Sequence, residues 1–343
     1  MALSHIEKPT LIERFVKLIP LPYPLAALIW SAVLPSSAGG YAFQYLMTRT
    51  TPLSLDYLPT AVLNILLPFY LFMIVRYMRL RVVAAEAPIA ARLSGGDRDY
   101  HRAFGRMTQT APVLLLTAVL GTFLMTVYAS TGILSPALVP IILNAIVVYL
   151  NTLAFSTYLW EFATASLGLH NLGGSSLRLG PFQEDRMMGV KPIGNLALTM
   201  TIAYYGGLLL TNLLLTRFLP SSPPTEALFF VLLLLGVGLF FLPLNSIHAK
   251  MQAEKRGILR EIGARYPRLG REQSQIRESA TIEDVHGGLE RLTDLQELEM
   301  LDRKAASLPT WPFDVQVVSK FVTIVLSVTA VLVSRFITGF LHI

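Results

Sequence analysis

The sequence predicts an all-α, polytopic membrane helix bundle with seven transmembrane helices, an inside N-terminus, an outside C-terminus and a cytoplasmic helical hairpin. First, 53% of the 343 residues are hydrophobic and 15% charged, with a mean hydropathy of +0.55, whereas a soluble domain has about 25% charged residues. Second, the apolar residues form long blocks. Third, Lys and Arg gather in alternate connections between these blocks, which indicates one orientation.

The apolar blocks are long enough to cross a membrane. No charged residue lies between Arg106 and Glu161, a length sufficient for two crossings. Other uncharged runs are Leu18–Thr48, Tyr57–Val75, Pro192–Thr216 and Ala227–Ala249. A helix needs about 20 apolar residues to cross the hydrocarbon. Because lipid offers no hydrogen-bond partner to the backbone, these blocks are predicted to be helices.

Six crossings fall in a membrane domain over residues 1–247, and a seventh lies in the last segment, 315–343. The expected spans are about 24–47, 58–79, 110–132, 137–166, 194–217, 225–248 and 315–338. Pro35 and the Gly39-Gly40 pair make the first span irregular, whereas Pro59 suits a helix start. The fourth span is expected to extend into the cytoplasm.

The distribution of basic residues predicts the topology. With the N-terminus inside, segments 1–17, 76–107, 169–194 and 248–319 are cytoplasmic and hold 24 of the 28 Lys and Arg residues. This asymmetry predicts a multi-pass protein of the cytoplasmic membrane whose inner face meets anionic lipid. Inner-leaflet lipid therefore accounts for the net charge of +6, and no nucleic-acid partner is expected.

Residues 248–314 predict a cytoplasmic helical hairpin and the elbow that follows it. Apolar residues at helical spacing continue the sixth crossing to Tyr266, where Pro267 is expected to end the helix. A second amphipathic pattern runs from Ile282 to Leu301. The 11 cations and 12 acids of segment 248–319 nearly cancel. Such a balance favours ion pairing between helices or between the subunits of a homo-oligomer, although a solvated hairpin without a partner fits equally well.

A Pro-x-Trp-Pro-aromatic corner joins the hairpin to the last crossing. Pro309 and Pro312 prevent a straight helical continuation. Trp311 and Phe313 are expected at the level of the lipid headgroups, which aromatic rings favour. The corner is therefore interpreted as an elbow, either a structural anchor or a hinge that transmits hairpin motion to the last helix.

No catalytic constellation is found in the sequence. It lacks a phosphate-binding loop, a zinc helix and a nucleophile elbow. It has no cysteine, and its six histidines are scattered. We therefore expect no enzyme activity, no cofactor and no metal site.

Two sets of polar residues within the crossings are candidates for a polar path or for helix packing. Asn144, Asn151 and Tyr158 recur every seven residues on the fourth span, so they share one face that Glu161 follows. Lys320, Ser327 and Ser334 have the same spacing on the last span. Such stripes line aqueous paths or bond helices together. A carboxylate in a spanning helix is by default a functional candidate, although Glu161 also fits a structural partner near the inner interface.

The segments "DRMMGVKPIGNLAL", "FLPLNSIHAKMQAEKRGIL" and "LPTWPFDVQVVSKF" resemble a group of uncharacterised prokaryotic polytopic membrane proteins with the same corner before the last crossing. The resemblance covers roughly the C-terminal half and implies no assigned function. The predicted topology is also similar to that of insect chemoreceptor-type seven-transmembrane channels, which assemble as tetramers around the last crossing. The Thr-Tyr and Gln-Phe signature of those channels is not met here.

These observations favour an oligomeric channel-like or sensory membrane protein, with the last helix near the central axis. A transporter remains open, because the first crossing carries Pro35 and Gly39-Gly40 at mid-membrane. An accessory subunit of a larger membrane complex also remains open.

Overall fold

The computed structural model describes Ile6 and residues 8–33, 58–130, 138–175, 177–183, 185–218, 223–276 and 282–340. Throughout these ranges the regular secondary structure is helical, apart from one isolated antiparallel bridge between Leu93 and Leu177. The all-α prediction is therefore confirmed for the described part of the chain.

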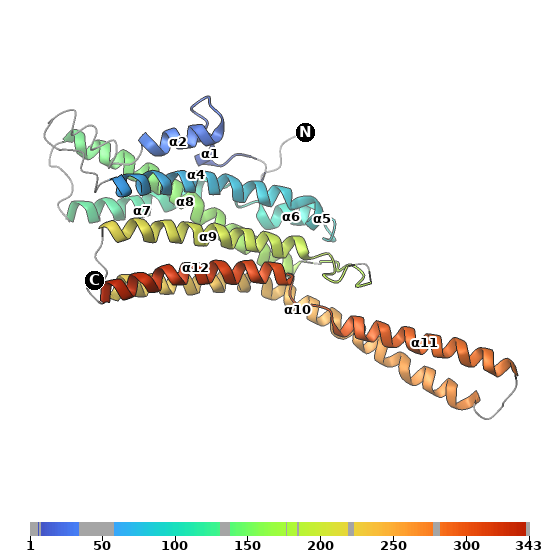
Figure 1. Cartoon of the computed structure of the whole chain (residues 1–343). Coiled ribbons are helices and arrows are strands. Elements are labelled where there is room, and N and C mark those ends of the chain that lie inside the picture. Colours follow the sequence, from blue (N-terminus) through green and yellow to red (C-terminus); the bar gives the residue numbers. More distant parts are fainter. Residues whose placement is uncertain are drawn as a thin grey trace.

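Most of the described helices form a bundle; the short helices of residues 86–90 and 97–104 lie at the end near the hairpin, and those of residues 11–16 and 23–33 lie along its side (Figure 1). The helices are α1 (Leu11–Val16), α2 (Tyr23–Val33), α4 (Leu58–Ala84), α5 (Glu86–Ala90), α6 (Asp97–Phe104), α7 (Thr110–Ser130), α8 (Leu138–Gly174), α9 (Lys191–Phe218), α10 (Pro223–Ile276), α11 (Ile282–Ala306) and α12 (Val315–Phe340).

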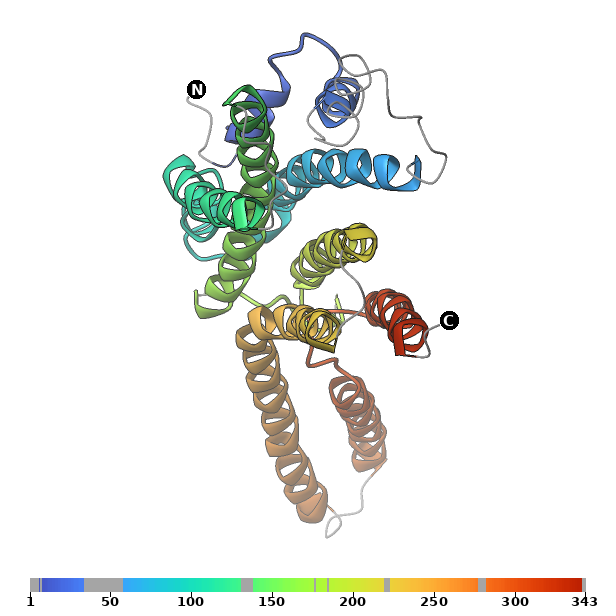
Figure 2. The same ribbon diagram turned by 90° about the vertical axis from the view of Figure 1, so that its left-hand side faces the viewer.

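Helix α9 lies between α4 and α12, and it also packs against α8 and α10 (Figure 2). Tyrosine hydroxyls tie it to its neighbours through main-chain carbonyls. Tyr204 and Tyr205 donate to Leu232 and Leu233 of α10, at 2.8 and 3.0 Å. Tyr70 of α4 donates to Ala203 at 2.7 Å. Each hydroxyl has a carbonyl partner inside an apolar core. These bonds therefore fix the position of α9 along the axes of α4 and α10.

Among the described residues, four helical segments are long and apolar enough to cross a membrane: Val62–Ala90, Lys191–Leu214, Phe229–Pro267 and Val315–Ser334. They coincide with the second, fifth, sixth and seventh predicted crossings. The segments Tyr23–Val33 and Thr110–Thr126 are apolar but shorter. Most of the predicted first crossing, over 34–47, lies outside the described residues, and α8 covers the predicted fourth. The number of seven crossings and their orientation stay predictions.

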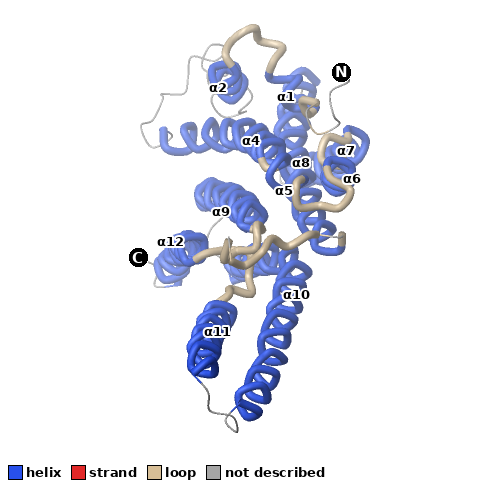
Figure 3. The backbone as a smooth tube through the Cα atoms, turned by 90° about the vertical axis from the view of Figure 1, so that its right-hand side faces the viewer, coloured by secondary structure: helices blue, strands red, loops and turns tan. Residues whose placement is uncertain are grey.

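The hairpin of α10 and α11 projects from the end of the bundle, with the two helices side by side (Figure 3). The expected end of its first helix at Tyr266 is wrong, because α10 continues through Pro267 to Ile276. Proline removes one N–H and displaces the carbonyl four residues earlier. That carbonyl belongs to the exposed Gly263, where an added Cβ would meet nothing within 4 Å, so water can hydrate it.

Candidate functional site

The predicted elbow is held by contacts to both α9 and α10. Trp311 stacks on His248 of α10 with ring centroids 4.1 Å apart, and the His248 Nδ1 atom lies 2.7 Å from the carbonyl oxygen of Thr310. Phe313 packs against Phe240, at 5.5 Å between centroids. The rings therefore contact the protein, which favours the interpretation of the corner as a structural anchor.

The start of α9 also fastens the elbow. Gly194 lies so close to the Pro312 carbonyl that a Cβ at this position would overlap it. The Lys191 Nζ atom lies 2.9 Å from the Asp314 Oδ2 atom, and the Val317 N–H donates to the Asp314 Oδ1 atom at 2.9 Å. Asp314 therefore caps the N-terminus of α12 while it pairs with α9. The Lys191 ammonium holds the pKa of Asp314 below its usual range.

A buried group of charged residues lies where α1, α4 and α8 meet. Glu13 of α1 accepts two hydrogen bonds from the Arg79 guanidinium of α4: from Nε at 2.7 Å and from Nη2 at 2.8 Å. Their side chains are only 2% and 10% exposed, so this is a bidentate ion pair removed from water. The main-chain N–H of Thr10 also donates to Glu13, which completes a capping box at the start of α1.

Glu161 of α8 interacts electrostatically with both members of this pair. It is fully buried, and neither of its carboxylate oxygens has a hydrogen-bond partner among the described residues. The Nε1 atom of the preceding residue, Trp160, donates to the Arg106 carbonyl, at 3.0 Å. Arg106 precedes α7, so Glu161 lies near the end of the bundle from which the hairpin projects. The group thus contains one guanidinium and two carboxylates, of which only Glu13 is hydrogen-bonded to the cation.

The other candidates on α8 make ordinary helix-packing contacts. The Asn151 Nδ2 atom donates to the Val147 carbonyl one turn earlier, at 3.1 Å. The buried Tyr158 hydroxyl reaches the carbonyls of Ala203 and Tyr204 on α9, at 3.4 and 3.3 Å. Asn144 lies in α8, but its side chain is outside the described set. The structure therefore joins this face of α8 to α9 at Tyr158.

The candidates on α12 lie on a different surface. Lys320, Ser327 and Ser334 are exposed, whereas Tyr158 and Glu161 are buried in the bundle. The two predicted polar stripes consequently do not form one site. Gln316 and Thr323 extend the stripe on α12, because both are exposed and fall on the same helical face. Sequence spacing alone could have identified them, since 316, 320, 323, 327 and 334 follow the helical period.

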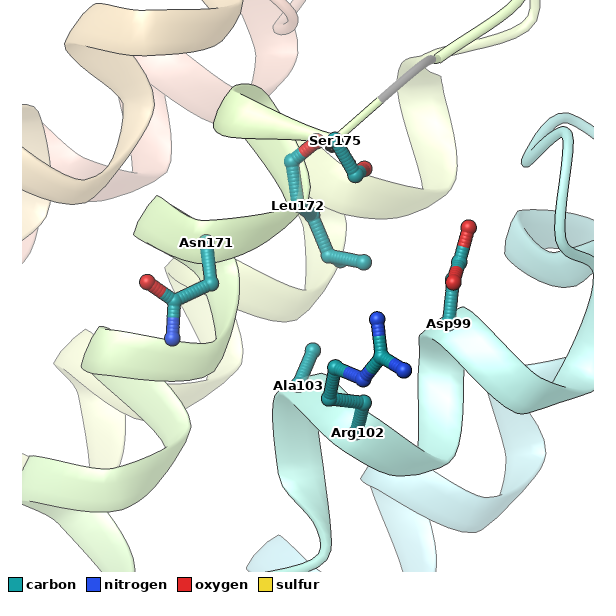
Figure 4. Close-up of a pocket in the computed structure, with 6 residues that line it drawn as sticks. All are labelled: Asp99, Arg102, Ala103, Asn171, Leu172 and Ser175. Carbon is teal, nitrogen blue, oxygen red and sulfur yellow. Dashed lines mark hydrogen bonds between the residues drawn. The ribbon is translucent and has the colours of Figure 1, made fainter.

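A cavity of about 290 Å³ opens between α6 and the end of α8 (Figure 4). Its lining includes Asp99 and Arg102 of α6, together with Asn171 of α8 and Ser175. Both charges belong to one helix, and the Asp99 carboxylate accepts a hydrogen bond from the Gly95 N–H at 3.1 Å. Within the described residues, no three His, Cys, Asp or Glu side chains are arranged to hold a metal ion.

Comparison with protein-family models, curated proteins and solved structures gives no match to this chain. The arguments on function therefore depend on the residues and their geometry.

Proposed function

We propose that the chain is a subunit of a homo-oligomeric, channel-like or sensory membrane protein in which α12 borders a central path. In this proposal the protein crosses the cytoplasmic membrane seven times, with its N-terminus and hairpin inside and anionic lipid at its inner face. The steep asymmetry of Lys and Arg supports this orientation.

The observation that carries the proposal is the polar stripe on α12. The stripe is defined by Gln316, Lys320, Thr323, Ser327 and Ser334, and the rest of the described chain leaves it exposed. Valine and leucine side chains flank it, including Leu326, which is 62% exposed. Apolar flanks suit lipid, but a continuous row of polar residues suits a neighbouring helix or water. Several copies of α12 arranged around one axis would turn their stripes towards a shared aqueous path.

Local hydrogen bonds draw the hydroxyl groups of the stripe back along α12. The Thr323 hydroxyl donates to the Ser319 carbonyl, and the Ser327 hydroxyl donates to the Thr323 carbonyl, each at 2.8 Å. These hydroxyls lie back along the helix, so the surface is of low relief. Short hydroxyl side chains of this kind leave space in front of the helix, which suits a path that water fills.

The absence of cysteine from the sequence makes a direct test possible. Ser327→Cys and Ser334→Cys are compared with Leu326→Cys and Val322→Cys, which are exposed on the apolar flank. Each variant is reconstituted in liposomes and treated with a charged, membrane-impermeant thiol reagent. We expect labelling at 327 and 334 and none at the flank, together with an ion flux that the labelling blocks. Equal protection of all four positions would overturn the aqueous path.

A second candidate, a transporter, is favoured by one observation. Glu161 is a fully buried carboxylate that interacts electrostatically with the Glu13–Arg79 pair. Transporters use such groups to bind protons or cations. Glu161→Gln is expected to abolish uptake driven by a proton gradient if the protein is a transporter. The same variant is expected to leave a flux through an α12-lined path unchanged.

A further inference from the structure

The hairpin carries two exposed faces that the described part of the chain leaves open. Its inner faces meet in a small apolar cluster that includes Ile262 of α10 and Leu298 of α11. The Lys255 ammonium reinforces this contact by donating to the carbonyls of Ala306 and Leu308, at 2.7 and 2.8 Å. Among the described side chains, Arg256 and Arg260 of α10 and Glu297 of α11 are exposed.

The two helices carry opposite charge. Residues 250–276 of α10 hold seven Lys and Arg and three Asp and Glu, whereas α11 holds three and seven. In the described part of the hairpin, each ion pair joins two residues of the same helix. Arg265 pairs with Glu261 in α10, and Arg303 pairs with Glu299 in α11. The opposite net charges of α10 and α11 would also favour contact between α10 of one hairpin and α11 of another.

The outer face of α10 is basic and of low relief. Ala253, Gly257 and Ala264 are exposed and fall on one side of the helix, with Arg256 and Arg260 alongside them. A Cβ added at Gly257 would meet nothing within 4 Å, so the surface there is open. This face offers a shallow seat with two guanidinium groups along one side.

The outer face of α11 is acidic and carries projecting apolar side chains. Leu292 is 55% exposed and Met300 is 69% exposed. Glu297 and Glu299 are exposed on the two sides of Met300. A large apolar side chain between two carboxylates is complementary in shape and charge to the seat on α10.

The two faces lie at the same height along the hairpin. Lys255 lies beside residues 306–308, and Ile262 lies beside Leu298. Antiparallel helices of equal rise then place Arg260 level with Met300. When two hairpins stand side by side on the same membrane, Met300 of one copy therefore meets the stretch from Gly257 to Ala264 of the other.

We propose that the outer face of α10 in one copy binds the outer face of α11 in a second copy of this chain. Met300 then seats against Gly257 and Ala264, and Arg260 pairs with Glu297 or Glu299 of the other copy. One chain presents both halves of the contact at matching heights but on opposite sides of the hairpin, so the contact is head-to-tail and a closed ring satisfies every copy. The inference rests on the proposed homo-oligomer and identifies the surface that joins its cytoplasmic parts.

Disulfide formation between copies tests the contact in the full-length, cysteine-free protein. Gly257→Cys protein is mixed with Met300→Cys protein during reconstitution and oxidised, and the 257–300 heterodimer is quantified. Gly263→Cys is the matched control, because an added Cβ is equally unhindered there but points about 100° away from the centre of the seat. We expect the 257–300 product to exceed the 263–300 product about tenfold. Equal yields would overturn the proposal.

Charge reversal provides the second arm. Arg260→Glu is expected to lower the 257–300 yield about tenfold, because like charges then face each other across the contact. Glu297→Arg combined with Glu299→Arg is expected to restore the yield in that background. Arg265→Glu is the control, because Arg265 pairs within its own helix. A yield that Arg260→Glu leaves unchanged would overturn the proposal.

The labelling of α12 separates this inference from the proposed function. Cross-linked hairpins together with a protected Ser327→Cys would support the hairpin contact and overturn the path. A labelled Ser327→Cys without hairpin cross-links would support the path and overturn the contact.

Discussion

The buried charged group at α1, α4 and α8 allows one chemical change to be made at two carboxylates that differ in their partners. Glu13→Gln and Glu161→Gln each replace a buried carboxylate by a neutral amide of nearly the same shape. Glu13 accepts two hydrogen bonds from Arg79, whereas Glu161 accepts none from the described residues. The two substitutions are therefore expected to affect stability very differently.

The magnitude follows from the partner that each substitution leaves behind. Removing one member of a buried ion pair costs about 3–5 kcal/mol, because the other charge stays buried without compensation. Glu161 offers Arg79 a second carboxylate nearby, which offsets part of this loss, so we expect about 3 kcal/mol for Glu13→Gln. Glu161→Gln removes no hydrogen bond and no direct ion pair that the described residues form. We expect that substitution to change the stability by less than about 1 kcal/mol.

The assay is unfolding in detergent, with wild type and both single variants measured together with the double variant. If Arg79 turns to Glu161 when Glu13 is neutral, the double variant loses both carboxylates and should be less stable than the two separate losses predict. Arg265→Gln serves as a surface control, because its ion pair with Glu261 is exposed and is expected to contribute under about 1 kcal/mol. A Glu161→Gln variant as unstable as Glu13→Gln would refute the reasoning, since it would show that Glu161 already has a strong partner.

The elbow supplies the remaining predictions. Gly194→Ala is expected to destabilise the protein by about 1–3 kcal/mol, because the new methyl group overlaps the Pro312 carbonyl. Thermal melts of this variant and of Gly174→Ala check the expectation. Gly174 is the control, because a Cβ added there meets nothing within 4 Å. For Asp314, Lys191 lowers the carboxyl pKa in the folded protein, so the stabilisation is present near neutral pH and is lost as the pH falls below about 4 through the folded pKa. Melts from pH 6 downwards should show a loss in wild type that is absent in Asp314→Asn, and identical profiles would contradict this assignment.

Composition and spacing were sufficient to predict the helices, because long apolar blocks in lipid have only one way to satisfy their backbone groups. The hairpin was also predictable from its amphipathic pattern. Its first helix was predicted too short, because the cost of Pro267 was weighed without knowing that the affected carbonyl is exposed. The rule that proline ends a helix therefore failed at Pro267, because water can hydrate the carbonyl that the proline displaces.

The pairing of Glu13 with Arg79 was not predicted. The two residues are 66 positions apart, and the sequence analysis placed Arg79 in a cytoplasmic connection. One signal was available: the Thr10-x-x-Glu13 spacing is that of a capping box, which places Glu13 at a helix start. The partner of that helix start depends on how α1 folds back over α4 and α8, and no local pattern contains that information.

The contact between Gly194 and Pro312 constrains how the last helix can move. With the Lys191–Asp314 pair beside it, this contact joins the starts of α9 and α12 at one point. Displacement of α12 at that end must carry α9 along, and α9 is in turn tied to α4 and α10 by tyrosine hydroxyls. If α12 moves away from the bundle, its displacement is therefore expected to be smallest at its start, where this contact holds it, and largest at its other end.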